Sequence, residues 1–185
     1  MNLQRVARVV AVSALMLSPF AVWLAAQTGT REDFPGVNTY WRVDATASNG
    51  GAIKAPDMVI PELKRRGFKA VINLAGGTAA EAEGAAVRAA GMTYFLIALD
   101  PQTLDPAPVE PFLKAVSDPT NHPVFIHSNN GHRGATLWMI KRVLVDAWSI
   151  EKAGAEATTI GLINDNANVP RYWQFAREYI AAHSK

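Results

Sequence analysis

The sequence predicts an α/β domain in which a central parallel or mixed sheet of four to five strands is flanked by helices. Short runs of branched and apolar residues alternate along the chain with longer stretches of helical periodicity. Such alternation is typical of a sheet with helices on both faces. The composition agrees, because 49% of the 185 residues are hydrophobic, which is enough for one ordinary core. With no internal repeat and no low-complexity linker, we expect a single domain over residues 39–185.

The first 26 residues differ from the rest of the chain. Arg5 and Arg8 precede an uncharged apolar run that ends in two alanines, which is the layout of a secretory signal peptide. We therefore expect cleavage after Ala26, a polar leader over residues 27–38, and a periplasmic or secreted protein with no stable membrane insertion. The alternative is a retained membrane anchor, since the apolar run is about as long as the ~17–25 residues that span a bilayer.

The net charge and the absence of cysteine exclude several kinds of binding partner and chemistry. Removal of the signal peptide takes away two arginines and no acid, so the formal charge falls from +2 to 0. The basic character belongs to the export segment, and no nucleic-acid partner is expected. The chain has no cysteine, so its fold depends on the core rather than on disulfides. It also has no thiol nucleophile and no thiolate metal ligand, and we expect neither a metal nor a cofactor.

The first half of the domain is expected to contain three strands and two helices. Gly67 and Gly91 stand where helices commonly end in a left-handed residue. Glu81 and Glu83 suit the first turn of the second helix, where acids complement the helix dipole. Pro61 lies inside the first helix and is expected to shorten or kink it. In order, the elements are a strand over 39–44, a turn over 48–51, a helix over 56–66, a strand over 69–74, a helix over 79–90 and a strand over 92–99.

The second half is expected to be mainly helical. A proline-rich loop that carries Asp100 and Asp105 follows the third strand. Residues 164–168 superficially resemble a calcium loop but lack its glycine and distal glutamate, so they are interpreted as a turn. The remaining elements are a helix over 109–117, a strand over 124–127, and helices over 134–148, 150–161 and 170–183.

The most informative stretch is residues 123–135, with the sequence PVFIHSNNGHRGA. A predicted strand leads into a polar loop with Gly131, and Arg133 lies where the helical period begins. Backbone N–H groups at a helix N-terminus carry partial positive charge, and an arginine binds phosphate or carboxylate through two nitrogens. Ligands of such sheets lie beyond the carboxyl ends of the strands, where residues 128–133 and Asp100 are both expected. The stretch therefore predicts an oxyanion-binding loop.

The order of elements and this loop resemble the dual-specificity branch of the protein tyrosine phosphatase superfamily. The chain is similar in particular to small bacterial domains related to the phosphatase part fused to NAD kinase, and to the phosphatase-like part of β-lactamase-hydrolase-like proteins. The similar segments include FPGVNTYWRVDA, LKRRGFKAVINL, FLKAVSDPTNHPVFIH and LWMIKRVLVDAWSIEKAGAEA. The resemblance implies a phosphatase-like fold and a phosphorylated small molecule or phosphoprotein as ligand.

The resemblance also implies roles for individual residues. In that family a cysteine thiolate attacks phosphorus, loop amides and an arginine hold the phosphoryl oxygens, and an aspartate protonates the leaving alcohol. Ser128 takes the position of the cysteine, and Arg133 that of the arginine. Asp100, or alternatively Asp105, takes that of the general acid. The amides would come from Asn129, Asn130, Gly131 and His132.

The loop departs from the family pattern at three points. Ser128 replaces cysteine, four residues rather than five separate it from the arginine, and Gly134 stands where active members often have Ser or Thr. A cysteine thiolate is populated near neutral pH when its pKa falls to ~3.5–7.5 at a helix N-terminus, whereas a serine alcohol stays protonated unless a base assists it. We therefore expect oxyanion binding with phosphatase activity that is weak or lost.

Two histidines beside Ser128 could serve as its base. Neighbouring residues of a strand point to opposite faces, so His127 is expected beneath the loop as a structural hydrogen-bonding residue. His132 is better placed to touch a ligand. The sequence leaves three alternatives open: an active phosphoric monoester hydrolase, a pseudophosphatase scaffold that binds a phosphorylated partner, and a serine introduced as a substrate trap.

Overall fold

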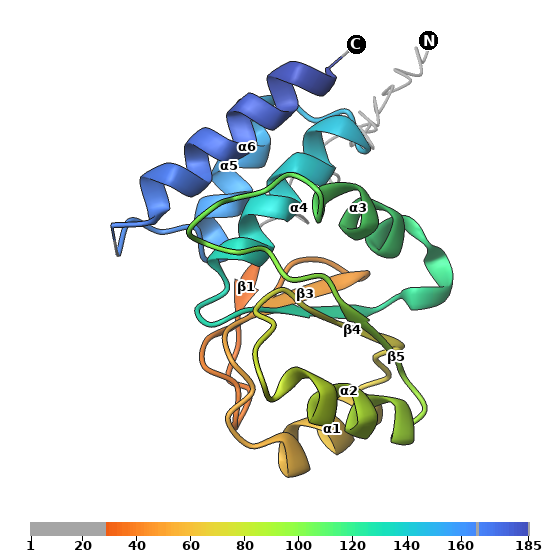
Figure 1. Cartoon of the computed structure of the whole chain (residues 1–185). Helices are drawn as coiled ribbons and strands as arrows, with labels where there is room; N and C mark the ends of the chain where they lie inside the picture. The colour runs from red at the N-terminus through yellow and green to blue at the C-terminus, as the bar shows by residue number, and fades with distance from the viewer. Residues whose placement is uncertain (1–28, 166, 185) are drawn as a thin grey trace, which may run out of the picture.

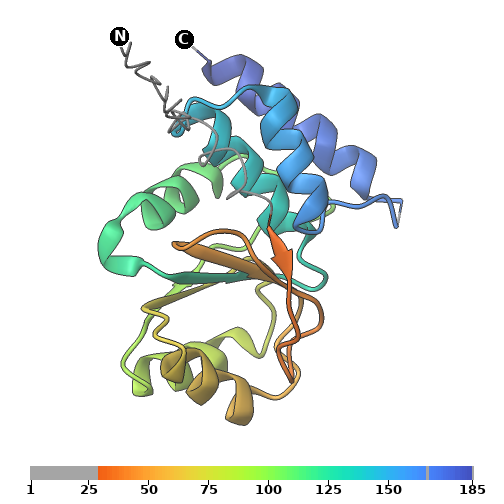
Figure 2. The same ribbon diagram turned by 180° about the vertical axis from the view of Figure 1, so that it is seen from behind.

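The computed structural model describes residues 29–165 and 167–184 and shows a mixed six-stranded sheet with helices on both faces (Figure 1; Figure 2). The predicted α/β class with a mixed sheet is confirmed, whereas the predicted number of four to five strands is wrong. The predicted signal peptide lies outside the described residues. Within them, no helix is both long enough and apolar enough to cross a bilayer.

The sheet has the strand order β1-β2-β3-β6-β4-β5. Its first two pairings are antiparallel, and β3, β6, β4 and β5 are then parallel to one another. The carboxyl ends of these four strands therefore meet at one edge, which is where ligands of such sheets bind. The strands are β1 (Thr30–Arg31), β2 (Tyr40–Arg42), β3 (Ala47–Gly50), β4 (Ala70–Asn73), β5 (Thr93–Leu96) and β6 (Val124–His127).

Two strands lie where the sequence predicted none. β3 occupies much of the turn expected over residues 48–51, because its polar side chains find partners inside the fold. The Ser48 hydroxyl lies 2.8 Å from the Tyr40 hydroxyl, and the Asn49 side chain donates to two backbone carbonyls. β1 falls in the predicted polar leader, and Phe34 from the same segment is buried in the core.

The helices divide between the two faces of the sheet. α1 and α2 cover one face, and the remaining four cover the other (Figure 1). α4 follows β6 after a short loop, is buried along most of its length, and contacts both α5 and α6. The helices are α1 (Pro56–Arg65), α2 (Ala80–Ala89), α3 (Val109–Ser117), α4 (His132–Leu144), α5 (Ile150–Thr159) and α6 (Val169–His183).

Several element boundaries follow directly from single residues. α3 and β6 begin and end where predicted. α4 begins at His132, before the predicted start, because Gly131 has a left-handed φ of 85° and turns the chain into the helix. It ends at Leu144, before the predicted end. α1 continues through Pro61, and Gly67 beyond it has the left-handed φ of 87° expected of a residue that ends a helix.

Candidate functional site: an oxyanion loop between β6 and α4

The loop between β6 and α4 lies at the carboxyl edge of the parallel strands. Its backbone continues the pairing toward β3, because the Ser128 N–H donates to the Gly50 carbonyl at 3.2 Å. The Asn129 carbonyl accepts from the Ala52 N–H at 3.1 Å. A Cβ atom added to Gly131 would come within 3.0 Å of a tryptophan ring, and its φ is left-handed, so glycine is required there. These contacts fix the path of the loop into the first turn of α4.

Ser128 lies at the centre of the loop and is 1% exposed. Its hydroxyl oxygen accepts a hydrogen bond from the Gly131 N–H at 3.1 Å, and no other described residue hydrogen-bonds it. The N–H groups in the first turn of α4 have no intrahelical acceptor. The serine oxygen therefore accepts from an amide beside the helix N-terminus, and no side chain of the described residues hydrogen-bonds it as a base would.

Arg133 is a buried cation without a carboxylate partner. It is 5% exposed, and its Nη1 donates to the carbonyls of Leu74 at 2.8 Å and Leu99 at 3.0 Å. No carboxylate of the described residues lies within ion-pair distance of it. Burial lowers the pKa of Arg133 below its ordinary value, and the neighbouring Tyr172 and Asp100 partly oppose this change. The backbone carbonyls orient the guanidinium, and none of the described carboxylates forms a direct ion pair with it.

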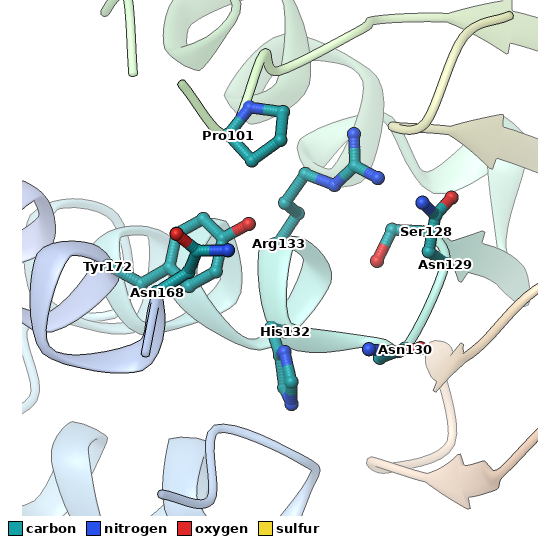
Figure 3. Close-up of a pocket in the computed structure, with 8 residues that line it drawn as sticks. All are labelled: Pro101, Ser128, Asn129, Asn130, His132, Arg133, Asn168 and Tyr172. Atoms are coloured by element: carbon teal, nitrogen blue, oxygen red, sulfur yellow. The ribbon is translucent and has the colours of Figure 1, made fainter. Parts of the chain in front are cut away.

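A cavity of about 310 Å³ opens in front of this arginine (Figure 3). It brings most of the predicted loop residues together with the start of α6 and with the loop after β5. Arg133 is the single lysine or arginine in its lining. The cavity is lined by Pro101, Ser128, Asn129, Asn130, His132, Arg133, Asn168 and Tyr172.

The two candidate acids differ in their distance from the cavity. Asp100 precedes the lining residue Pro101 and is near enough to Arg133 to affect its pKa. It is exposed, and its Oδ1 accepts from the Gln102 N–H at 2.8 Å. Asp105 is also exposed, its carboxylate accepts from a backbone N–H within its own loop, and no described contact joins it to residues 128–133. Asp100 is therefore the candidate closer to the site.

His127 lies beneath the loop, on the face of the sheet that α2 covers. It is 3% exposed and stacks on Phe125, with ring centroids 5.7 Å apart. Its Nε2 lies 2.9 Å from Glu83 Oε1. Burial raises the pKa of Glu83, but the hydrogen bond and charge of His127 outweigh this and hold the pKa below its ordinary value. His127 thus braces β6 against α2, and its imidazole makes no described hydrogen bond to the Ser128 hydroxyl.

His132 begins α4 and faces the cavity. Its Nε2 lies 3.1 Å from Asp165 Oδ1, and its ring lies against that of Tyr172 at 6.2 Å between centroids. The residues before α6, which were interpreted as a turn, therefore supply both Asp165 and the lining residue Asn168. Within residues 29–165 and 167–184, no three His, Asp or Glu side chains are grouped so as to hold a metal ion.

Asn49 supports the loop from β3 and was missed by the sequence analysis. Its Nδ2 donates to the carbonyls of Gly131 at 3.0 Å and Ile160 at 2.8 Å, while its buried Oδ1 has no hydrogen-bond partner. A Cβ atom on Gly134 would lie 2.0 Å from that Oδ1. The asparagine thus fills the space that a Ser or Thr side chain at position 134 would need.

Tyr172 and Asn168 were also missed as site residues. Tyr172 gave no signal because its spacing on α6 is that of a buried apolar face, and Asn168 belonged to the expected turn. Only the packing of α6 beside α4 brings them to the cavity. A search of the sequence for polar residues just before helices could have found Asn168, but not Tyr172.

No family model matches the sequence, and no curated protein is significantly similar to it. Several solved structures share its fold. A DUF442 protein from Shewanella putrefaciens CN-32, provisionally named a phosphatase, is 22% identical with a TM-score of 0.64 over 81% of this chain and 94% of its own. A cysteine-to-serine form of P. aeruginosa TpbA in complex with pTyr is 18% identical, with a TM-score of 0.63 over 85% and 98%. PTPMT1 in complex with PI(5)P is 18% identical, with a TM-score of 0.57 over 79% and 99%.

Proposed function

We propose that this chain, whose fold is that of the protein tyrosine/dual-specificity phosphatase superfamily to which these structures belong, binds a phosphate monoester or related oxyanion through residues 128–133. The observation that carries the proposal is Arg133, a buried cation that faces a cavity and has no carboxylate partner within residues 29–165 and 167–184. A charge removed from water needs a compensating partner, and an anion in the cavity supplies it. We also propose that the protein is exported, as residues 1–26 lead us to expect.

The loop geometry favours a tetrahedral anion. The Gly131 amide donates to the Ser128 hydroxyl just before α4, and the helix N-terminus adds partial positive charge. Arg133 lines the same cavity, and a guanidinium binds phosphoryl oxygens through two parallel hydrogen bonds. The ligand we propose is accordingly a phosphorylated small molecule or a phosphoprotein.

We further propose that turnover is weak or absent. In the part of the chain that the structure describes, the Ser128 hydroxyl is paired with an amide donor alone, which stabilises an oxygen acceptor but removes no proton. His127 is held by Glu83 on the other face of the sheet. Binding without rapid turnover is consistent with the TpbA structure, in which a cysteine-to-serine form is in complex with pTyr.

Ligand-dependent melting tests the binding site. Inorganic phosphate or vanadate at about a hundredfold excess over Kd is expected to stabilise the protein by ~2.7 kcal/mol. Arg133→Ala should remove this stabilisation, whereas Arg65→Ala, on the exposed side of α1, should retain it. Sodium chloride at matched ionic strength controls for screening. A melting temperature of the native chain that does not respond to phosphate or vanadate would refute the site.

Phosphate release from an aryl phosphate separates binding from catalysis. The native chain is expected to release little phosphate, and Ser128→Cys to release much more, because a thiolate at this helix N-terminus is a stronger nucleophile. Ser128→Ala supplies the background rate. Equal release by the native chain and the cysteine variant would instead favour an active phosphoric monoester hydrolase with a serine nucleophile. If neither the native chain nor Ser128→Cys releases phosphate, and phosphate still raises the melting temperature, the result would favour a pseudophosphatase scaffold.

A further inference from the structure

Tyr172 extends from α6 to the wall of the cavity opposite the loop. The residue is 5% exposed, and its ring packs against that of His132. Figure 3 shows its hydroxyl turned into the cavity, toward Arg133. The ring is therefore fixed in the core, while the hydroxyl is presented at the place where a bound anion would lie.

The other tyrosines of the chain show how unusual this hydroxyl is. Tyr40 pairs with the Ser48 hydroxyl at 2.8 Å, Tyr94 accepts from the Asn73 side chain at 3.0 Å, and Tyr179 donates to a carboxylate at 3.0 Å. Among the described residues, no hydrogen bond reaches the hydroxyl of Tyr172. A largely buried tyrosine usually has a partner for its hydroxyl. The cavity is where that partner can bind.

The electrostatic surroundings of the Tyr172 hydroxyl keep it neutral, so that it can act as a hydrogen-bond donor. Burial raises the pKa of Tyr172 above its ordinary value, with the nearby charge of Arg133 acting in the opposite sense. The hydroxyl is consequently protonated at neutral pH and can donate. It adds a hydrogen bond to an anion without adding a second buried charge beside the arginine.

We propose that Tyr172 is a ligand-binding residue whose hydroxyl donates a hydrogen bond to the oxyanion held by Arg133 and the loop amides. This rests on the proposed function, and it makes the C-terminal helix a third part of the site beside the loop and α4. The anion is then held from two sides, by amides at the end of β6 and by a phenol on α6.

Calorimetric titration with inorganic phosphate tests this assignment. Tyr172→Phe keeps the ring and removes only the donor, and a hydrogen bond to a charged group commonly contributes about tenfold or more in affinity. We expect Kd for phosphate to rise at least that much. Tyr179→Phe is the matched control on the same helix, because it removes a hydroxyl that donates to Glu110 and does not line the cavity. Its Kd should equal that of the native chain.

A measurement on the native chain makes the test independent of variant folding. With tyrosine ¹³C-labelled at Cζ, four resonances are expected from the four tyrosines, and phosphate should shift the one from Tyr172 most. Native binding with an unchanged Kd in Tyr172→Phe and no such shift would overturn the assignment of Tyr172 while leaving the proposed function intact. Absence of phosphate binding by the native chain would refute both.

Discussion

The two ends of α4 each carry a buried arginine, and the two arginines have opposite surroundings. Arg133 and Arg142 are both 5% exposed. Arg133, in the first turn, donates to backbone carbonyls and has no carboxylate partner among the described residues. Arg142, near the last turn, pairs with Asp44, Asp146 and Glu156 at 2.7 to 2.9 Å. Equal burial thus accompanies three direct carboxylate partners at Arg142 and, among the described residues, no carboxylate within ion-pair distance at Arg133.

The pKa values of the two arginines follow this difference. Burial alone lowers the pKa of an arginine, and for Arg133 it is the dominant influence. For Arg142, hydrogen bonds and charge from Glu156 and its neighbours outweigh burial and raise the pKa. The comparison teaches that burial does not distinguish a structural arginine from a binding one. The distinction lies in whether the protein itself supplies the counter-charge.

The largest expected effect on the free energy of unfolding comes from Arg142, at the C-terminal end of α4. Arg142→Met should destabilise the protein by ~3–5 kcal/mol, because it leaves the buried Glu156 carboxylate without its cation. Urea unfolding measures the loss. Arg133→Met, at the other end, should cost only about 1 kcal/mol, since it removes hydrogen bonds to two carbonyls but breaks no ion pair. Equal losses in the two variants would contradict the comparison.

A smaller effect on the free energy of unfolding is expected from the uncharged contacts at the N-terminal end of α4. Gly134→Ala should destabilise by ~1–3 kcal/mol, because the new Cβ would lie 2.0 Å from Asn49 Oδ1, whose side chain is held by two hydrogen bonds. In an Asn49→Ala background the same change should cost much less, because of the atoms nearest the new Cβ only Ile126 Cγ2, at 3.1 Å, would then remain and alanine is the better helix former.

Urea unfolding of the four proteins forms a double-mutant cycle. A coupling free energy near zero between positions 49 and 134 would show that the steric argument fails. A large coupling would support the view that position 134 is a glycine because the Asn49 side chain occupies the space beside it. The change from Ser or Thr to glycine would then be more than the loss of a hydroxyl group.

The sequence predicted the strand, the loop and the helix around Ser128 well because their signals are local. A β-prone run, one glycine and an arginine at the start of a helical period all lie within residues 123–135. The same local reasoning placed α3 and β6 at their observed boundaries. By contrast, β3 was predicted as a turn because the residues Ser48, Asn49 and Gly50 are polar or small, and their partners lie in distant segments.

The parts that could not be predicted depend on tertiary packing. Nothing in the α6 sequence distinguishes Tyr172 from the other buried residues of that helix until α6 is packed beside α4. Arg142 likewise looks like a surface residue near a helix end. Its role becomes clear only when Asp44 from the turn after β2 and Glu156 from α5 reach it.

The smallest expected effect is a dependence of stability on pH at the C-terminal end of α4. Burial raises the pKa of Asp44, but hydrogen bonds from Thr46 and the charge of Arg142 outweigh this and hold the pKa below its ordinary value. A depressed pKa in the folded state means that the carboxylate stabilises the fold above its unfolded pKa and that this stability is lost as pH falls through the folded one. Asp44→Asn should therefore lower stability at pH 7 by up to about 1 kcal/mol and flatten the loss of stability below about pH 4.

Urea midpoints between pH 7 and pH 3 test this expectation. Arg142→Met is the matched background, because it removes the charge and the hydrogen bond of the guanidinium from Asp44 but leaves the hydrogen bonds of Thr46, so Asp44→Asn should then cost less at pH 7 than in the native protein. An Asp44 contribution that is undiminished in that background would mean that Thr46 alone, and not the arginine, holds the carboxylate. In that case the C-terminal end of α4 would depend on local turn contacts, and Arg142 would be neutralised chiefly by Glu156 and Asp146.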